Sequence, residues 1–220
     1  DALPILYSLS VADAWVRAGV YKNVLVVGSE VHSTGVEFTE RGRDVAVLFG
    51  DGAGAALVGE ATRPEQGILA LELHADGSGA YDLWLEAPAS KMMPRLTHEM
   101  LDAGKHYPSM NGKQVFRWAA EKMPEVAHSV VKKAGFTMAE MDMLVPHQAN
   151  MRINQMVAAK LGIPEEKVVH NIEVYGNTTA ATIPIGLSES WHGGKIGAGS
   201  KVLMAAFGAG FTWGGAVAAL

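Results

Sequence analysis

The chain has 220 residues, of which 49% are hydrophobic and 19% are charged, and its formal net charge is −5. This composition supports a large buried core, argues against disorder, and argues against general nucleic-acid binding, which needs clustered Lys and Arg. Cysteine is absent and no apolar run reaches the ~18 residues of a membrane span, so we exclude disulfides and thiolate metal sites and expect a cytoplasmic protein without membrane association.

The first half of the chain alternates between helical and strand-like segments. Residues 9–19, "LSVADAWVRAG", predict an amphipathic helix that ends at a glycine, and residues 23–30, "NVLVVGSE", predict a buried strand. Residues 45–60, "VAVLFGDGAGAALVGE", predict a strand, a glycine-rich turn and a second strand, and residues 67–76 predict a further strand. Residues 75–111 are irregular, and such a long excursion is often functional.

The second half continues the same alternation. Residues 112–135 predict a long helix that Pro124 is expected to kink, and "TMAE" at Thr137–Glu140 matches a capping box. The remaining predicted elements are a strand followed by a sharp turn (141–150), a helix (151–162), a strand (167–172), a helix (177–194) and two strands joined by glycines (201–220).

One pattern occurs twice along the chain. "LSVADAW…KNVLVVGSE…LFGDGAGAALVGE" parallels "GLSESW…SKVLMAAFGAG…FTWGGAVAAL", with a period of about 175 residues, which is too long for a solenoid repeat. The repeat predicts two related α/β halves packed about a pseudo-twofold axis. We assign residues 1–61 to a remnant of the first half, present only from its last helix onward, and residues 62–220 to the second half.

Three short motifs carry residues suited to catalysis, and each would also suit an ordinary structural role. His147 follows an apolar strand in "VPHQAN", where ligands and catalytic groups of α/β sheets gather, but a hydrogen-bonded loop histidine would also fit. Asn177 in "YGNTTAA" begins a helix, where asparagine is a favoured N-cap. "FGAGF" at residues 207–211 is either a glycine hairpin or the source of an oxyanion-binding backbone N–H.

Taken together, these stretches resemble a known enzyme family. "LSVADAWVRAG", "LVVGSE", "FGDGAGAA", "LVPHQANMRI", "YGNTTAATIP" and "FGAGFTWG" are similar to β-ketoacyl-acyl carrier protein synthase III, a condensing enzyme of the thiolase superfamily, from about Leu9 to Leu220. The resemblance implies an α/β thiolase-like fold with two pseudo-symmetric halves in an αβαβα layered arrangement, the first half being incomplete. Family members are longer, so we expect an N-terminal truncation here.

The resemblance fails at the position of the family's nucleophile. In the family a cysteine begins the helix that continues into "YSLSVADAW", and counting back from Tyr7 places that cysteine at Ala2. We therefore expect that "DALPI" is not native sequence, and that this chain by itself does not transfer acyl groups.

The resemblance also implies a reaction and a set of site residues. The reaction is the decarboxylative Claisen condensation of acyl-CoA with malonyl-acyl carrier protein, which initiates fatty acid biosynthesis in a homodimer without a metal or other cofactor, the coenzyme A thioesters being substrates. The Nε2 atom of His147 and the amide of Asn177 would stabilise the enolate, and the N–H of Ala209 would bind an acylation oxyanion. The residues implied in substrate binding are Arg41, Gly42, Phe116, Ala119 and Asn150 for coenzyme A and pantetheine, and Arg152, Arg117 and Lys160 for the carrier protein.

Several of these residues also fit a purely structural role, and the motifs allow more than one function. Phe116 and Ala119 would suit a helix core, and Arg117 and Lys160 would suit a solvated surface. The protein could instead be a thiolase-fold acyltransferase or a starter synthase of a polyketide pathway, or a non-catalytic module that binds carrier protein or coenzyme A. Zinc chemistry and nucleotide hydrolysis are disfavoured, because the histidines lack H-E-x-x-H spacing and "FGDGAG" lacks the Lys-Ser/Thr of a phosphate loop.

Overall fold

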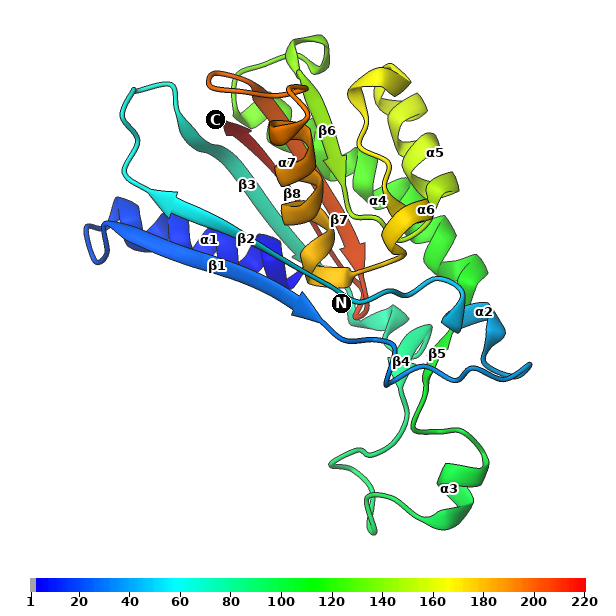
Figure 1. The fold of residues 1–220 in the computed structure, drawn as a ribbon. Coiled ribbons are helices and arrows are strands. Elements are labelled where there is room, and N and C mark those ends of the chain that lie inside the picture. The colour runs from blue at the N-terminus through cyan, green and yellow to red at the C-terminus, as the bar shows by residue number, and fades with distance from the viewer. Residues whose placement is uncertain (1–2) are drawn as a thin grey trace.

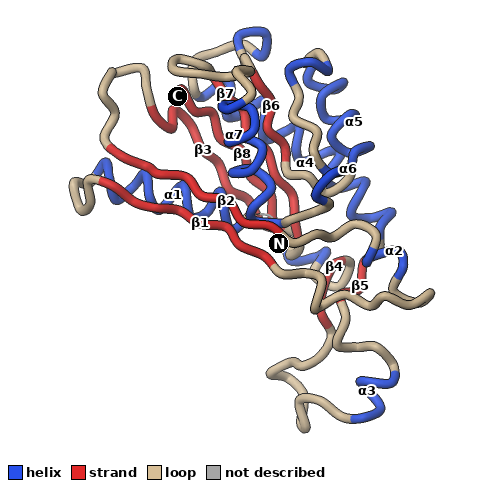
Figure 2. Tube along the Cα trace, viewed as in Figure 1, coloured by secondary structure: helices blue, strands red, loops and turns tan. Residues whose placement is uncertain are grey.

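The computed structural model describes residues 3–220 and shows an α/β protein of stacked layers (Figures 1 and 2). The α-helices are α1 (Pro4–Arg17), α2 (Arg43–Ala46), α3 (His98–Asp102), α4 (Gly112–Lys133), α5 (Met151–Leu161), α6 (Ile172–Tyr175) and α7 (Thr182–His192). The strands are β1 (Asn23–Glu30), β2 (Gly52–Gly59), β3 (Gly67–Ala75), β4 (Leu83–Leu85), β5 (Pro108–Met110), β6 (Met143–Pro146), β7 (Lys201–Gly208) and β8 (Thr212–Ala219). Short 3₁₀ helices are η1 (Gly77–Gly79), η2 (Met138–Glu140), η3 (Glu165–Lys167) and η4 (Thr179–Ala181).

Two sheets enclose a layer of helices. β1 and β2 form an antiparallel pair, and a second sheet has the order β3-β8-β7-β6, in which only β6 and β7 run parallel. α1 packs on both sheets, through β1 and β2 on one side and β3 and β8 on the other, and α7 packs on β2 and β6. α4 covers the opposite face of the second sheet, with α5 beside it (Figure 1). The described residues therefore form four layers in the order sheet, helices, sheet, helices.

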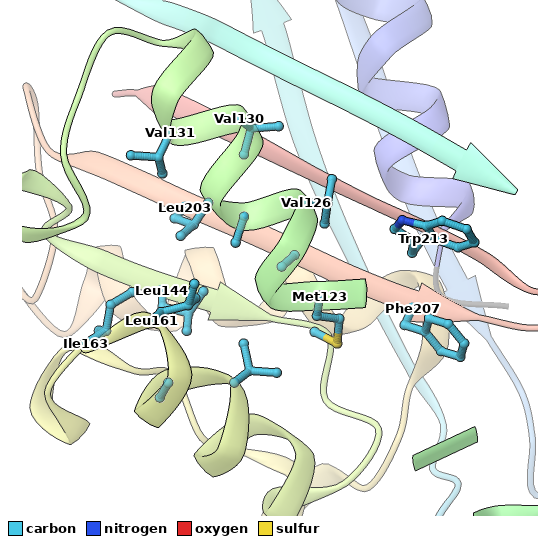
Figure 3. Close-up of a cluster of buried hydrophobic side chains, with 14 of the residues drawn as sticks. Met123, Val126, Val130, Val131, Leu144, Leu161, Ile163, Leu203, Phe207 and Trp213 are labelled. Atoms are coloured by element: carbon cyan, nitrogen blue, oxygen red, sulfur yellow. The ribbon is translucent and has the colours of Figure 1, made fainter. Parts of the chain in front are cut away.

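The second sheet is buried on both faces, as its continuous apolar strands predict. Successive side chains of a strand point to opposite faces, so β7 contributes Leu203 and Phe207 to the cluster beneath α4 and α5, and Val202 and Met204 to the cluster beneath α1. Figure 3 shows the first of these clusters, where α4 side chains such as Val126 point toward the sheet. This packing fixes the ends of β6 and β7, which carry the site described below.

The helix–strand–strand order that repeats in the sequence is present twice in the structure. α1 leads into the β1–β2 pair, in which Asn23 is opposite Gly59, and α7 leads into the β7–β8 pair, in which Lys201 is opposite Ala219. α1 and α7 lie in the same central layer. The division of the chain at residue 61 stays a prediction.

Two predicted strands are wrong. Residues 45–50 form the end of α2 and a turn, and only Phe49 makes an isolated bridge, to Asn177. Residues 167–172 end η3 and enter α6, with a single bridge between Leu144 and Val168. Both segments contain β-branched residues, but such residues form a strand only where a neighbouring backbone runs alongside to pair with them.

The long helix is confirmed as α4, and Pro124 lies inside it without ending it. A proline has no N–H to donate to the carbonyl four residues earlier, which here belongs to Ala120. The Nζ of Lys160 on α5 donates to that carbonyl oxygen at 2.7 Å and replaces the missing helical bond. The predicted capping box is also present, with the Thr137 N–H donating to the Glu140 carboxylate at 2.8 Å.

The predicted excursion is a β4–β5 pair that carries a protruding arm with α3 at its end (Figure 1). The loop before α2 is joined to this arm, because the Arg41 guanidinium donates to the Asp102 carbonyl oxygen at 2.9 Å. Within residues 3–220, no helix is both long enough and apolar enough to cross a membrane.

Candidate active site

His147 lies where β6 ends, at the same sheet edge at which the parallel neighbour β7 ends. The His147 N–H donates to the Ala205 carbonyl oxygen at 2.8 Å, which extends the pairing with β7 by one residue. The chain then turns. The buried side-chain amide of Gln148 stabilises this turn by donating to the carbonyl oxygens of Pro146 and Val169 at 3.0 and 2.9 Å. This turn leads into α5 and leaves the imidazole 4% exposed.

Asn150 ends that turn and starts α5. Its Oδ1 accepts the N–H of Arg152 at 2.9 Å, which is the bond expected of a helix N-cap. The side-chain oxygen of Asn150 is therefore engaged in capping α5.

Asn177 reaches the same region from the loop before α7. Its backbone N–H donates to the Leu48 carbonyl oxygen at 2.7 Å, and its carbonyl oxygen accepts the Gly50 N–H at 3.1 Å. Its side-chain Oδ1 accepts the Thr179 N–H at 2.9 Å, although the N-cap of η4 is Thr178 and not Asn177 as predicted. This bond uses the amide oxygen of Asn177 and leaves the NH₂ group as the available donor.

The β7–β8 hairpin supplies the third part of the site. Phe211 is fully buried, and its backbone exchanges two hydrogen bonds with Asp76, of 2.6 and 2.8 Å. The Thr212 hydroxyl donates to the Ala209 carbonyl oxygen at 3.0 Å. These contacts hold the hairpin tip in place beside the end of β6.

These segments enclose a cavity of about 310 Å³ at the edge of the sheet where β6 and β7 end. His147, Asn177 and Ala209 all line it. The other lining residues are mostly apolar and come from β4, β5, α4, α5 and nearby loops: His32, Leu48, Phe49, Leu83, Trp84, Leu85, Pro108, Met110, Gly112, Val115, Phe116, Ala119, Met123, Ala149, Asn150, Ile153, Thr179, Phe207 and Gly208. A largely apolar cavity with a few convergent donors suits an acyl or pantetheine chain that ends in a polar carbonyl group.

Burial controls the protonation of His147. Loss of hydration disfavours the charged imidazolium and lowers the pKa of His147 to about 3. The ring is therefore neutral near pH 7 and carries one proton. Its Nδ1 lies 2.8 Å from the hydroxyl of Thr182, so Nε2 is the ring nitrogen available to the cavity.

Comparison with known sequences identifies the family. A sequence model of 3-oxoacyl-[acyl-carrier-protein] synthase III matches residues 4–77, and a model of the C-terminal part of the same synthase matches residues 131–220. The chain belongs to the 3-oxoacyl-[acyl-carrier-protein] synthase III family. Members of this family are also called β-ketoacyl-[acyl-carrier-protein] synthase III.

Individual synthase III proteins agree with this assignment. The chain is 40% identical to the β-ketoacyl-[acyl-carrier-protein] synthase III of Chlorobium luteolum and 41% identical to that of Clostridioides difficile, over 96% of this chain and 63% of each relative. The chain thus spans less than two thirds of the length of these curated relatives.

Solved synthase III structures have the same fold. The enzyme from Thermus thermophilus superposes with a TM-score of 0.90 at 38% identity, and the enzyme from Aquifex aeolicus with 0.87 at 39% identity. Each match covers 100% of this chain and 65% of the other. The predicted α/β thiolase-like fold class is confirmed.

Several residues that the resemblance to synthase III singled out lie in the cavity, and others lie outside it. Phe116, Ala119 and Asn150 line the cavity with the three catalytic candidates. Arg41 is paired with the Glu37 carboxylate at 2.8 Å, and neither Arg41 nor Gly42 lines the cavity. Their assignment to the coenzyme A site stays a prediction, and Ala2 lies outside the described residues.

The three basic residues assigned to carrier-protein binding have different surroundings. Arg117 is exposed on α4, and Lys160 is engaged with the Ala120 carbonyl oxygen at 2.7 Å. Arg152 is exposed in the first turn of α5. Binding of a synthase III carrier protein at these residues stays a prediction.

Three further residues at the site, His32, Thr179 and Thr182, were not predicted from the sequence. His32 follows β1 and lines the cavity, with its Nε2 atom 3.1 Å from the Thr179 hydroxyl and its ring 4.7 Å from that of Phe49. Burial, opposed by the charge of Glu30, lowers the pKa of His32. His32 has the same sequence signal as His147, a polar residue just after an apolar strand. Nothing in the sequence indicates that Thr179 and Thr182 belong to the site.

Proposed function

We propose that this synthase III family member serves the decarboxylative Claisen condensation of acyl-CoA with malonyl-acyl carrier protein that initiates fatty acid biosynthesis. The observation that carries the proposal is that His147 and Asn177 line one cavity while the amide oxygen of Asn177 is held by the Thr179 N–H. The chain has no cysteine, so the acyl-enzyme step through a thiol does not take place on these 220 residues. The decarboxylation step is the one that its own residues can perform.

Decarboxylation breaks the bond between the malonyl carboxylate and the α-carbon. The electron pair of that bond moves into the α-carbon and the thioester carbonyl, so negative charge develops on the thioester oxygen. The Asn177 NH₂ group and the Nε2–H of His147 are hydrogen-bond donors suited to that oxygen. Removal of one such preorganised donor raises a barrier by ~3 kcal/mol.

The apolar walls contribute by excluding water from the charged oxygen, which strengthens both hydrogen bonds. A pantetheine chain is expected to lie along Phe116 and Ala119, with Asn150 beside it, because all three line the cavity. In a synthase III that carries the family's cysteine, the enolate carbon then attacks the acyl-cysteine, a carbon–carbon bond forms, and the cysteine thiolate leaves. We further propose a cytoplasmic homodimer, as the resemblance implies.

The test is malonyl decarboxylation by this chain. Purified chain is incubated with malonyl-acyl carrier protein, and acetyl-carrier protein is measured by mass spectrometry. Asn177→Asp replaces the NH₂ donor with an acceptor of nearly the same shape, and we expect the rate to fall on the order of 100-fold. An unchanged rate in this variant contradicts the proposal.

A second arm uses acetyl-CoA and tests the nucleophile. This chain is expected to gain no covalent acyl group, because it contains no thiol, whereas a version with the family's cysteine segment is expected to gain one. Tight binding of malonyl-carrier protein without decarboxylation, in both versions, would instead support a non-catalytic binding module.

One structural comparison supports a second candidate function. The priming β-ketosynthase from the R1128 polyketide pathway superposes with a TM-score of 0.87 at 32% identity, covering 100% of this chain and 63% of that one. A starter synthase would use the same two donors with a different acyl group. The acyl-CoA preference of the version with the family's cysteine segment separates the two functions.

A further inference from the structure

The buried Nδ1 atom of His147 has a hydrogen-bond partner that neither the motifs nor the family assignment indicated. Nδ1 lies 2.8 Å from the hydroxyl oxygen of Thr182, the first residue of α7, which is 2% exposed. The same hydroxyl oxygen lies 2.9 Å from the carbonyl oxygen of Thr179, three residues earlier. A single hydroxyl proton therefore has two acceptors within reach.

The direction of that proton determines the tautomer of His147. If the hydroxyl donates to the Thr179 carbonyl oxygen, it accepts from Nδ1, which must then carry the ring proton, and Nε2 presents a lone pair to the cavity. If the hydroxyl donates to Nδ1, the ring proton is on Nε2 and is available to a substrate oxygen. Only the second arrangement supplies the donor that decarboxylation needs.

The surroundings permit donation to the imidazole. The Thr179 carbonyl oxygen also accepts the backbone N–H of Thr182, so it keeps a partner when the hydroxyl turns away. For Nδ1, Thr182 is the hydrogen-bond partner found among residues 3–220. Nδ1 keeps this partner in either arrangement, so the choice between them follows from the need for a donor at Nε2 in the proposed reaction.

We propose that Thr182 is a positioning residue that donates its hydroxyl proton to Nδ1 of His147 and thereby holds the Nε2–H toward the cavity. The β-branched side chain restricts χ1 and so limits the hydroxyl to few positions. The proposal rests on the proposed function, because the need for an Nε2–H donor selects this tautomer, whereas the NMR test of the tautomer does not depend on turnover.

Nitrogen-15 NMR of the chain labelled at histidine tests the tautomer directly. Long-range ¹H–¹⁵N spectra distinguish the two neutral forms, and His147→Gln identifies the resonance. We expect the Nε2–H tautomer, unchanged between pH 5 and 8. Observation of the Nδ1–H tautomer overturns the proposal, whether or not the chain decarboxylates malonyl-carrier protein.

Two substitutions test the catalytic consequence. Thr182→Ser keeps the hydroxyl, and we expect its decarboxylation rate to stay within about threefold of the original. Thr182→Val keeps the shape and removes the hydroxyl, and we expect kcat to fall about 10- to 100-fold with KM nearly unchanged, because the ring loses its orientation but the binding surface is kept. Thr178→Val, an equally buried neighbour, serves as the folding control and should leave kcat unchanged.

Equal kcat in the Thr182→Val variant and the original chain overturns the proposal. A loss in Thr182→Val accompanied by a lower unfolding midpoint and an equal loss in Thr182→Ser would assign Thr182 a purely structural role, which also overturns it. If the original chain shows no decarboxylation, the proposed function fails while the NMR result still decides the tautomer.

Discussion

At the scale of single residues, the buried histidine of the site makes stability depend on pH. The pKa of His147 is lowered by burial to about 3, whereas the same side chain in the unfolded chain titrates near its ordinary value of 6.5. Between these two values the unfolded state binds a proton that the folded state does not. The free energy of unfolding should therefore fall as the pH is lowered through this window, by up to ~1.4 kcal/mol per pH unit from this residue.

Urea unfolding at pH 7 and pH 5 measures this effect. His147→Gln removes the titrating group and leaves the other seven of the eight histidines as a common background. We expect a steeper loss of stability toward pH 5 in the original chain than in the variant. Equal losses in both would show that His147 is accessible to protons in the folded state.

The residues of the site differ in how far the sequence could reveal them. His147, Asn177 and Ala209 stand in motifs at the ends of predicted elements, and the family resemblance assigned their roles. Thr182 carries no such signal, because its importance comes from an imidazole that lies 35 positions away in the chain. Contacts of this kind become visible only when the packing of α7 against β6 is known.

At the scale of elements, the contact between α4 and α5 depends on a proline. Pro124 leaves the Ala120 carbonyl oxygen without its helical donor, and Lys160 supplies one at 2.7 Å. Lys160→Met keeps the aliphatic stem and removes the donor, so we expect a loss of ~1–2 kcal/mol in the free energy of unfolding. Chemical denaturation at neutral pH measures it.

Pro124→Ala provides the matched control for Lys160→Met. Alanine restores the N–H that the Ala120 carbonyl oxygen lacks, so Lys160→Met should cost clearly less in the Pro124→Ala background. A double-mutant cycle with zero coupling energy between the two positions would contradict the pairing.

The contact between β1 and η4 depends on a glycine. A Cβ added at Gly28 would lie 2.5 Å from the Ala180 carbonyl oxygen, and this backbone atom cannot move without shifting η4. We expect Gly28→Ala to lower the free energy of unfolding by ~1–3 kcal/mol and to reduce decarboxylation, because η4 holds the Asn177 amide through Thr179.

Gly197→Ala is the control for that substitution, since a Cβ there meets no atom within 4 Å. Thermal unfolding and the decarboxylation assay report on the two expected effects. Wild-type behaviour of Gly28→Ala in both measurements would show that β1 can move away from η4 without cost.

Elements were predictable from sequence where an apolar run is long and its pairing is regular. The apolar runs that became β1, β7 and β8 are long enough to be recognised as strands. The predicted burial of β1 is wrong for one of its faces, because Leu25 and Val27 are exposed among the described residues. Residues 45–50 and 167–172 also contain β-branched residues, but they form β-bridges only at Phe49 and Val168. Local composition does not record whether a partner strand is present, so these two segments could not be distinguished from true strands.

At the scale of the whole molecule, the layered arrangement leaves one apolar sheet face uncovered among the described residues. Alternation along β1 buries Val26 beneath the central helices and turns Leu25 and Val27 outward, where they are 65% and 58% exposed. Leu57 on the paired strand β2 is 70% exposed and stands directly opposite Leu25. Neighbouring exposed apolar side chains on a two-stranded sheet favour self-association.

We therefore expect this face to determine how strongly the chain self-associates in solution. Leu25→Thr combined with Leu57→Thr keeps the β-propensity of both strands and removes the apolar contact surface. The double variant should show less self-association by light scattering and sedimentation at the same concentration. Val47→Thr combined with Val174→Thr is the matched control, because both valines are 75% exposed but lie outside the sheet. An equal decrease in this control would point to exposed apolar area in general, and no decrease in either variant would point to backbone pairing at the open edges of β1 and β2.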